Sequence, residues 1–231
     1  MTDPIKKREI AQSEALDKTA KIISGLVPGG ASVYELFTAI VTPLHVNRRE
    51  EWVREVTIRL HQLETSERIN LEELSQKEEF NTIITKATLL AQQTHQKEKH
   101  EALRNVVIKS AEELPKLLKN YDETEYFLNI LEEINPVQMF LLKLFHNPEP
   151  KVNDLKSKIP GTPTLNSWQV IAYLYPELGK KKEMISQYWR ELQRLGLMVG
   201  NDITIGRHTK HKIQKLTTEL GDRFLEMIGN D

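Results

Sequence analysis

The feature that most limits the fold of this chain is the helical spacing of its apolar residues, which recur every three or four positions before residue 146. Such a stripe is typical of an amphipathic helix that buries one face. Five stripes have this spacing: Val33, Leu36, Phe37, Ile40, Val41 and Leu44; Trp52, Val53, Val56, Leu60 and Leu63; Phe80, Ile83, Ile84, Ala87, Leu90 and Ala91; Leu103, Val106 and Val107; and Phe127, Ile130, Leu131 and Ile134. The sequence therefore predicts a mainly α fold that begins with a helical bundle over residues 1–134.

Polar residues at the expected spacing mark several helix starts. Ser75 is followed three residues later by Glu78, which predicts a capping box at the start of a long helix. Asn135 precedes Pro136, and proline is tolerated in a first helical turn because its missing N–H has no partner there. Residues 65–75 are polar and are predicted to form a connection.

The character of the sequence changes near residue 135, where we place a domain boundary. Residues 151–231 carry 13 Lys and Arg against 9 Asp and Glu, whereas residues 1–150 carry 19 against 24. The later elements are short, and their order is that of a winged helix. They are a helix at 136–146, a short element near 168–175, a charged helix near 181–195, β-type runs at 198–205 and 212–216, and a closing helix from Thr218. We therefore predict a winged-helix-like α+β domain over residues 135–231, in which Gly196 ends the charged helix with a left-handed conformation.

Two motifs with the beginnings of enzymatic or ligand chemistry are incomplete. The chain has no cysteine, which excludes thiolate metal sites and a cysteine nucleophile. Gly25–Ser32 has the glycine spacing of a phosphate-binding loop, but Ala31 stands where the lysine is required. His100 and Glu101 begin a zinc-protease pattern, but Arg104 replaces its second histidine. We expect a protein that is not an enzyme and holds no cofactor or metal.

Basic side chains gather in the expected recognition helix and hairpin of the C-terminal domain. In a DNA-binding winged helix, residues at these positions contact phosphates and base edges. Many winged helices bind proteins instead, and the net charge of -1 for the whole chain does not single out a polyanion. Both a protein partner and duplex DNA stay open, and a homo-oligomer is compatible with either. The candidate contact residues are Lys181, Lys182, Gln187, Arg190, Arg194, Arg207, His208, Lys210 and Lys212.

One long stretch, Ile22–Leu44, carries a single charge, Glu35, and is long enough to cross a bilayer. Its glycines, its prolines and its one-sided apolar stripe favour a turn followed by a core helix. A conditional contact with membranes through this stretch stays open as an alternative. The N-terminal residues lack the basic start and apolar run of a secretory signal, so we expect a cytoplasmic protein.

Two C-terminal segments carry a family resemblance. Leu192–Met198 reads LQRLGLM, and Leu216–Leu225 reads LTTELGDRFL. Together they resemble the C-terminal signature of the abortive-infection alpha family of bacterial proteins, and Ile134-Asn135-Pro136 followed by Phe140-Leu141-Leu142 looks like the segment that precedes it. The resemblance implies a non-enzymatic bacterial protein of phage defence that binds a partner or damages the host on infection. It implies no catalytic residues. The alternatives are a DNA-binding transcriptional regulator and a membrane-active effector that uses residues 22–44.

Overall fold

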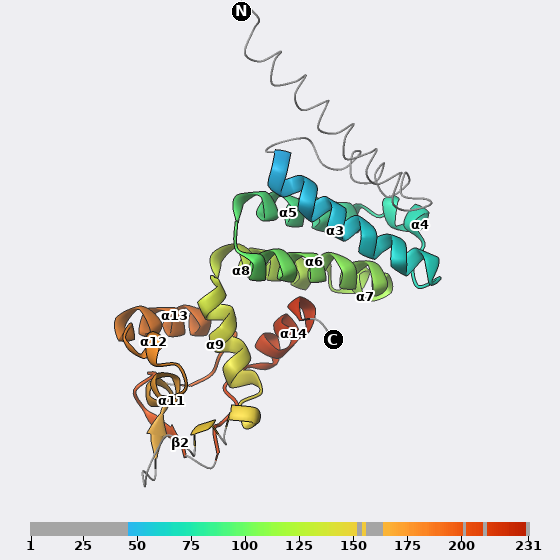
Figure 1. Cartoon of the computed structure of the whole chain (residues 1–231). Helices are drawn as coiled ribbons and strands as arrows, with labels where there is room; N and C mark the ends of the chain where they lie inside the picture. Colours follow the sequence, from blue (N-terminus) through green and yellow to red (C-terminus); the bar gives the residue numbers. More distant parts are fainter. Residues whose placement is uncertain (1–45, 152–153, 156–163, 201, 210–211, 230–231) are drawn as a thin grey trace, which may run out of the picture. The chain divides into compact units, whose positions relative to one another are not determined.

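The computed structural model describes residues 46–151, 154–155, 164–200, 202–209 and 212–229 (Figure 1). Ile22–Leu44 lies outside the described residues, as does Lys210. The described chain is mainly helical, which confirms the predicted class. It divides into two compact units. Unit 1 contains the residues up to Glu133 together with 227–229, and unit 2 runs from Ile134 to Glu226.

Unit 1 is a bundle in which α5 packs against α3, α6 and α8. All members of the four predicted stripes that the structure describes are buried, and Trp52, Leu60, Phe80 and Phe127 are among the largest fully buried side chains. The helices of unit 1 are α3 (Val46–Thr65), α4 (Leu71–Ser75), α5 (Glu78–Gln93), α6 (Lys97–Glu112), α7 (Leu114–Lys119) and α8 (Tyr121–Glu133). The helical spacing thus located both the elements and the core of this bundle.

The predicted capping box at Ser75 and Glu78 is wrong. Ser75 is the last residue of α4, and its hydroxyl donates to the Glu72 carbonyl oxygen at 2.7 Å. The N-cap residue of α5 is Lys77, which caps the helix with no side-chain hydrogen bond. Helix α4 itself occupies the end of a segment predicted to be a connection. Its N-cap is Asn70, whose side chain accepts from the Glu73 amide.

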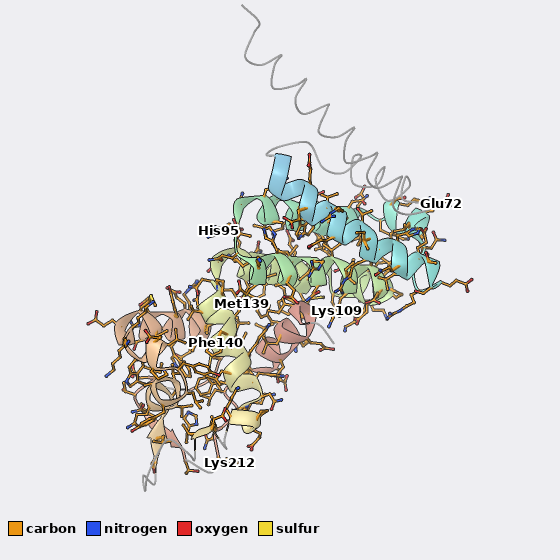
Figure 2. All side chains as sticks on the ribbon, viewed as in Figure 1. Glu72, His95, Lys109, Met139, Phe140 and Lys212 are labelled. Carbon is orange, nitrogen blue, oxygen red and sulfur yellow. The ribbon has the colours of Figure 1, made fainter. Side chains whose placement is uncertain are left out.

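In its described residues, unit 2 consists of short helices and a small antiparallel sheet. Two capping boxes, Asn135 with Gln138 and Asn166 with Gln169, start α9 and α11. The elements are α9 (Pro136–His146), the 3₁₀ helix η1 (Glu149–Lys151), β1 (Leu165–Asn166), α11 (Ser167–Leu174), α12 (Pro176–Gly179), α13 (Lys182–Arg194), β2 (Gly206–His208) and α14 (Glu219–Ile228), whose last two residues belong to unit 1. Side chains pack throughout this unit, and Phe140 on α9 meets Tyr175 edge to face, with ring centroids 4.7 Å apart (Figure 2).

The strands differ from those predicted. Strand β2 pairs with β1, and Met198 forms an isolated antiparallel bridge with Thr217. The run at 198–205 is not one continuous strand, because Gly200 has a φ of 116° and the Asp202 carboxylate accepts from the backbone and hydroxyl of Thr204 in a local turn. The winged-helix assignment of this unit therefore stays a prediction.

Two glycines set the approach of α14 to the end of α13. Gly196 has a φ of 71°, which confirms the predicted left-handed stop. The Leu197 carbonyl oxygen accepts from the Thr218 amide at 3.1 Å. A Cβ at position 221 would lie 2.2 Å from that same oxygen, so only glycine lets α14 come this close.

Candidate functional site

The outer face of α13 is defined here by three exposed residues of the candidate surface, Gln187, Arg190 and Arg194. The opposite side of the helix buries Ile185, Trp189 and Leu192, and the Trp189 ring meets Phe145 edge to face at 5.2 Å. Because successive residues turn by about 100° around a helix, the three outer residues project away from this core. All three are exposed, as are Lys181 and Lys182 at the start of the helix.

A chain of hydrogen bonds fixes two of these outer side chains. Arg190 Nη2 donates to Gln187 Oε1 at 2.8 Å, and Gln187 Nε2 donates to Glu191 Oε1 at 3.0 Å. The other Glu191 oxygen accepts from Gln138 Nε2 at 2.7 Å. Gln138 is buried, and its Oε1 accepts from the Asn135 amide in the capping box of α9. Through the buried Gln138, the capping box of one helix thus orients exposed groups on another.

Acidic side chains lie among these basic residues. Glu183 is exposed on the same outer face, and Glu191 borders it. The pKa of Asp202 is lowered, chiefly by hydrogen bonds from the side chain and backbone of Thr204 and further by the charges of Arg190 and Lys182. Asp202 therefore lies near both cations. The surface has mixed charge, and it offers hydrogen-bond donors and acceptors in fixed positions.

His208 is not part of this surface, which corrects the prediction for it. Its side chain is fully buried and stacks on Phe145, with ring centroids 5.6 Å apart. Nδ1 accepts from the Gln214 amide at 3.1 Å, so the ring proton lies on Nε2, 2.9 Å from Ser167 Oγ. Side chains alternate between the two faces of a strand, and position 208 of β2 faces the core.

The Ser167–His208 pair has the composition of a nucleophile and its base but the wrong arrangement. A base must accept the serine proton on the imidazole nitrogen that faces the hydroxyl. Here that nitrogen is the protonated one, and Ser167 is also buried. The pair therefore joins β2 to the start of α11 as a structural contact.

The other hairpin candidates are only partly described. Arg207 lies in β2 by its backbone, and Lys210 is outside the described residues. Lys212 is exposed (Figure 2), and its backbone bridges Thr209. Of the nine candidates, Gln187 and Arg190 are hydrogen-bonded to each other on α13. Arg190 and Lys182 are linked through Asp202, because the charges of both lower the pKa of its carboxyl.

A cluster that the sequence did not indicate surrounds Asp222 in the first turn of α14. Lys215 Nζ donates to Asp222 Oδ2 at 2.6 Å, the Thr217 hydroxyl donates to Oδ1, and His146 Nδ1 lies 2.8 Å from Oδ1. Burial raises the pKa of Asp222, but the hydrogen bonds from Lys215, Thr217 and His146 outweigh it and lower the pKa to about 2. His146 is 76 positions from Asp222, and no motif spacing links the two.

The described part of the chain holds no recognisable metal site. No group of three or more His, Asp or Glu side chains is arranged to hold a metal ion there. None of the helices described is both long enough and apolar enough to cross a membrane. No family model, curated protein or solved structure matches this chain.

Proposed function

We propose that this chain is a non-enzymatic, cytoplasmic protein of bacterial phage defence that acts by binding a protein partner through unit 2. The observation that carries the proposal is the exposed outer face of α13, where Gln187 and Arg190 are held by hydrogen bonds that begin in the core. Ordered side chains lose less conformational entropy on binding than free ones. A prearranged polar surface of this kind favours recognition of a specific partner.

The order of elements supports a winged-helix-like recognition module. Helices α9, α11 and α13 are followed by strand β2 and by the bridge between Met198 and Thr217. In this arrangement α13 takes the position of the recognition helix. The phage-defence setting is supported by the sequence resemblance of Leu192–Met198 and Leu216–Leu225 to the abortive-infection alpha family.

A protein partner is favoured over DNA by the charges of the surface. A polyanion would bring phosphates close to Glu183, Glu191 and Asp202, and carboxylates repel phosphates. A protein surface with charges of both signs can pair with cations and carboxylates together. His208, which would add a hairpin contact to DNA, is buried in the core.

Duplex DNA is the second candidate, because Arg190 and Gln187 are residue types that read base edges and both are exposed beside Arg194. A DNA-binding chain would bind duplex with an affinity that falls steeply as salt rises. The membrane-effector alternative depends on Ile22–Leu44, which lies outside the described residues, and it stays a prediction.

Site-specific photocrosslinking in the producing bacterium tests the proposal. A benzophenone amino acid replaces Glu183, which is exposed on the outer face, and in a control it replaces Lys143, which is exposed on α9. We expect one defined protein adduct from position 183 during phage infection and none from position 143. Nucleic-acid adducts would favour the DNA function, and the absence of any adduct specific to position 183 would reject the α13 surface.

Charge reversal links the surface to the biological effect. We expect the double variant Arg190→Glu, Arg194→Glu to lose the adduct from position 183 and any protection against phage plaques. The matched control Lys143→Glu changes an exposed cation of the same unit and should retain both. Circular dichroism of both variants shows that the helices are intact. Protection retained by the double variant would separate the defence role from this surface.

A further inference from the structure

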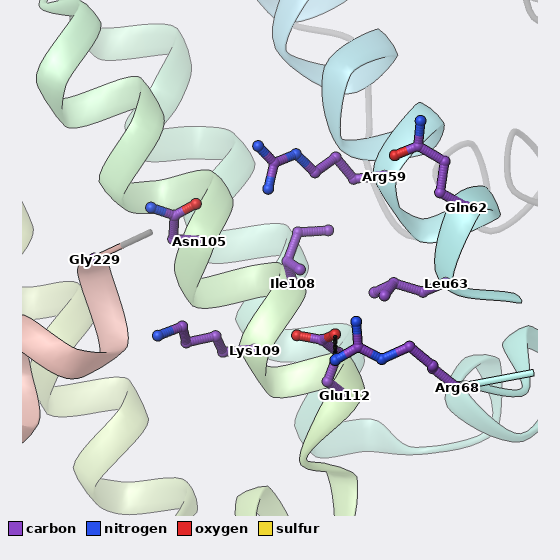
Figure 3. Close-up of a pocket in the computed structure, with 9 residues that line it drawn as sticks. All are labelled: Arg59, Gln62, Leu63, Arg68, Asn105, Ile108, Lys109, Glu112 and Gly229. Carbon is purple, nitrogen blue, oxygen red and sulfur yellow. Dashed lines mark ion pairs between the residues drawn. The ribbon is translucent and has the colours of Figure 1, made fainter. Parts of the chain in front are cut away.

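A pocket of about 590 Å³ lies in unit 1, between the C-terminal half of α3 and one face of α6 (Figure 3). Gly229, which also belongs to unit 1, closes one end. Ligand pockets for small organic molecules commonly have volumes of roughly 300–1,000 Å³, so this one has room for more than an inorganic ion. It is lined by Arg59, Gln62, Leu63, Arg68, Asn105, Ile108, Lys109, Glu112 and Gly229.

Cations dominate the lining. Arg59, Arg68 and Lys109 face a single carboxylate, Glu112, whose Oε1 lies 2.6 Å from Arg68 Nη2. The formal charge of the lining side chains is therefore +2. A phosphate monoester carries about -1.5 to -2 at neutral pH, so the charge of the pocket matches one such group.

Among the residues that the structure describes, Arg59 is the lining cation that takes no part in holding the fold together. It extends from α3 toward Asn105 and Ile108 on α6 (Figure 3), and we find no hydrogen bond or ion pair from it to any residue that the structure describes. A guanidinium group presents its donors as a planar fork that fits two phosphate oxygens at once. Arg59 is thus placed and equipped to hold an anion in this space.

The remaining lining suits the organic part of a ligand. Leu63 and Ile108 are buried and form an apolar floor. The Gln62 amide is exposed at the rim, where it can donate and accept hydrogen bonds. Asn105 is buried, and its Nδ2 donates to the Ile228 carbonyl oxygen at 2.9 Å, which fixes the end of the pocket formed by Gly229.

We infer that this pocket binds an organic phosphate of the size of a nucleoside monophosphate. Arg59 holds the phosphate, Lys109 adds positive charge from α6, and Arg68 adds more beside its ion pair with Glu112. The flat organic part lies over Leu63 and Ile108. The inference concerns unit 1 and is independent of the partner surface proposed for α13.

Isothermal titration calorimetry with the full chain tests this inference. The probes are the four ribonucleoside 5′-monophosphates, adenosine and inorganic phosphate. We expect at least one monophosphate to bind with a Kd below about 1 mM, an affinity that a single ion-paired site can supply. Adenosine lacks the charge and inorganic phosphate lacks the apolar part, so the affinity of each should be at least about tenfold lower than that of the monophosphate.

A matched pair of variants assigns the binding to the pocket. Arg59→Ala removes the phosphate contact and should weaken the bound monophosphate about tenfold, because it deletes charge-assisted hydrogen bonds. Arg54→Ala removes an exposed arginine from the same helix outside the pocket and should leave binding unchanged. Equal losses in both variants would point to general charge attraction and overturn the inference.

Two further outcomes would also overturn it. If inorganic phosphate binds as tightly as every monophosphate, the pocket does not recognise the organic part. The absence of heat with every probe at millimolar concentration would reject a phosphate site.

Discussion

Substitution of Gly221 by alanine tests how α14 is held against Leu197, because helix propensity predicts a gain in stability and steric crowding predicts a loss. In an exposed helix interior, alanine is more favourable than glycine by about 1 kcal/mol. At position 221, however, the new Cβ would lie 2.2 Å from the Leu197 carbonyl oxygen and 3.1 Å from its carbon. Real Cβ atoms essentially never come closer than 3.0 Å to such a neighbour, so either the helix or the Leu197 backbone must move.

That movement is costly because the neighbour is backbone and is already bonded. Overpacking of a close-packed site costs about 1–3 kcal/mol. Displacement of the Leu197 carbonyl also weakens its hydrogen bond from the Thr218 amide, which contributes about 1 kcal/mol. Set against a gain of about 1 kcal/mol from helix propensity, the net effect of Gly221→Ala is a loss of about 2 kcal/mol in the free energy of unfolding.

Urea unfolding followed by tryptophan fluorescence measures this loss, since Trp168 and Trp189 both lie in unit 2. Hydrogen exchange in peptides that cover α14 shows where the structure loosens. Gly196→Ala is the control: its Cβ would meet only Leu220 Cδ2 at 3.6 Å, and the strain at a φ of 71° costs about 1 kcal/mol. A chain with Gly221→Ala that unfolds at the same or a higher urea concentration than the parent would refute the reasoning.

Three further predictions concern unit 2. The pKa of Asp222 is lowered from 3.8 to about 2, so its ionised form contributes stability that is complete above pH 3.8 and is lost as the pH falls through 2. Because this carboxylate is partly exposed, we expect about 1–2 kcal/mol, measured as a difference in unfolding free energy between the parent and Asp222→Asn that shrinks from pH 5 to pH 2; a constant difference would contradict it. Asn135→Ala removes the acceptor of the Val137 and Gln138 amides and should cost about 1 kcal/mol in urea unfolding, whereas an unchanged midpoint would show that water replaces the cap. His208→Phe leaves the Gln214 amide and the Ser167 hydroxyl without their partner and should lower the free energy of unfolding by about 2 kcal/mol. Lys212→Ala should leave this free energy almost unchanged, and equal losses in the two variants would contradict a buried role for His208.

The helical part of the fold could be predicted because its signal is local. The stripes that include Trp52 and Phe80 repeat with the period of the helix, and each is buried as expected. Asn135 and Pro136 likewise start α9 where the sequence places it. A local signal can also mislead. Ser75 has the residue type and the spacing to Glu78 that are typical of an N-cap, yet it is the last residue of α4.

The candidate sites depend on contacts that no local pattern contains. His208 carries the same type of side chain as an exposed hairpin residue, and only the pairing of β2 with β1 reveals that it faces the core. The outer face of α13 could be predicted from helical spacing, but the hydrogen bond from Gln138 that orders it joins residues 53 positions apart. The pocket beside Arg59 combines α3, α6 and Gly229, which are far apart in the sequence.

The placement of residues 227–229 in unit 1 affects how the chain is made. Asn105 is buried in α6, and the acceptor for its amide is the carbonyl of Ile228, 123 positions later. During translation this hydrogen bond therefore cannot form until the ribosome has synthesised all of unit 2. A chain that stops anywhere in unit 2 lacks Ile228, so a buried amide of the N-terminal bundle loses its acceptor and a lesion in one unit also destabilises the other.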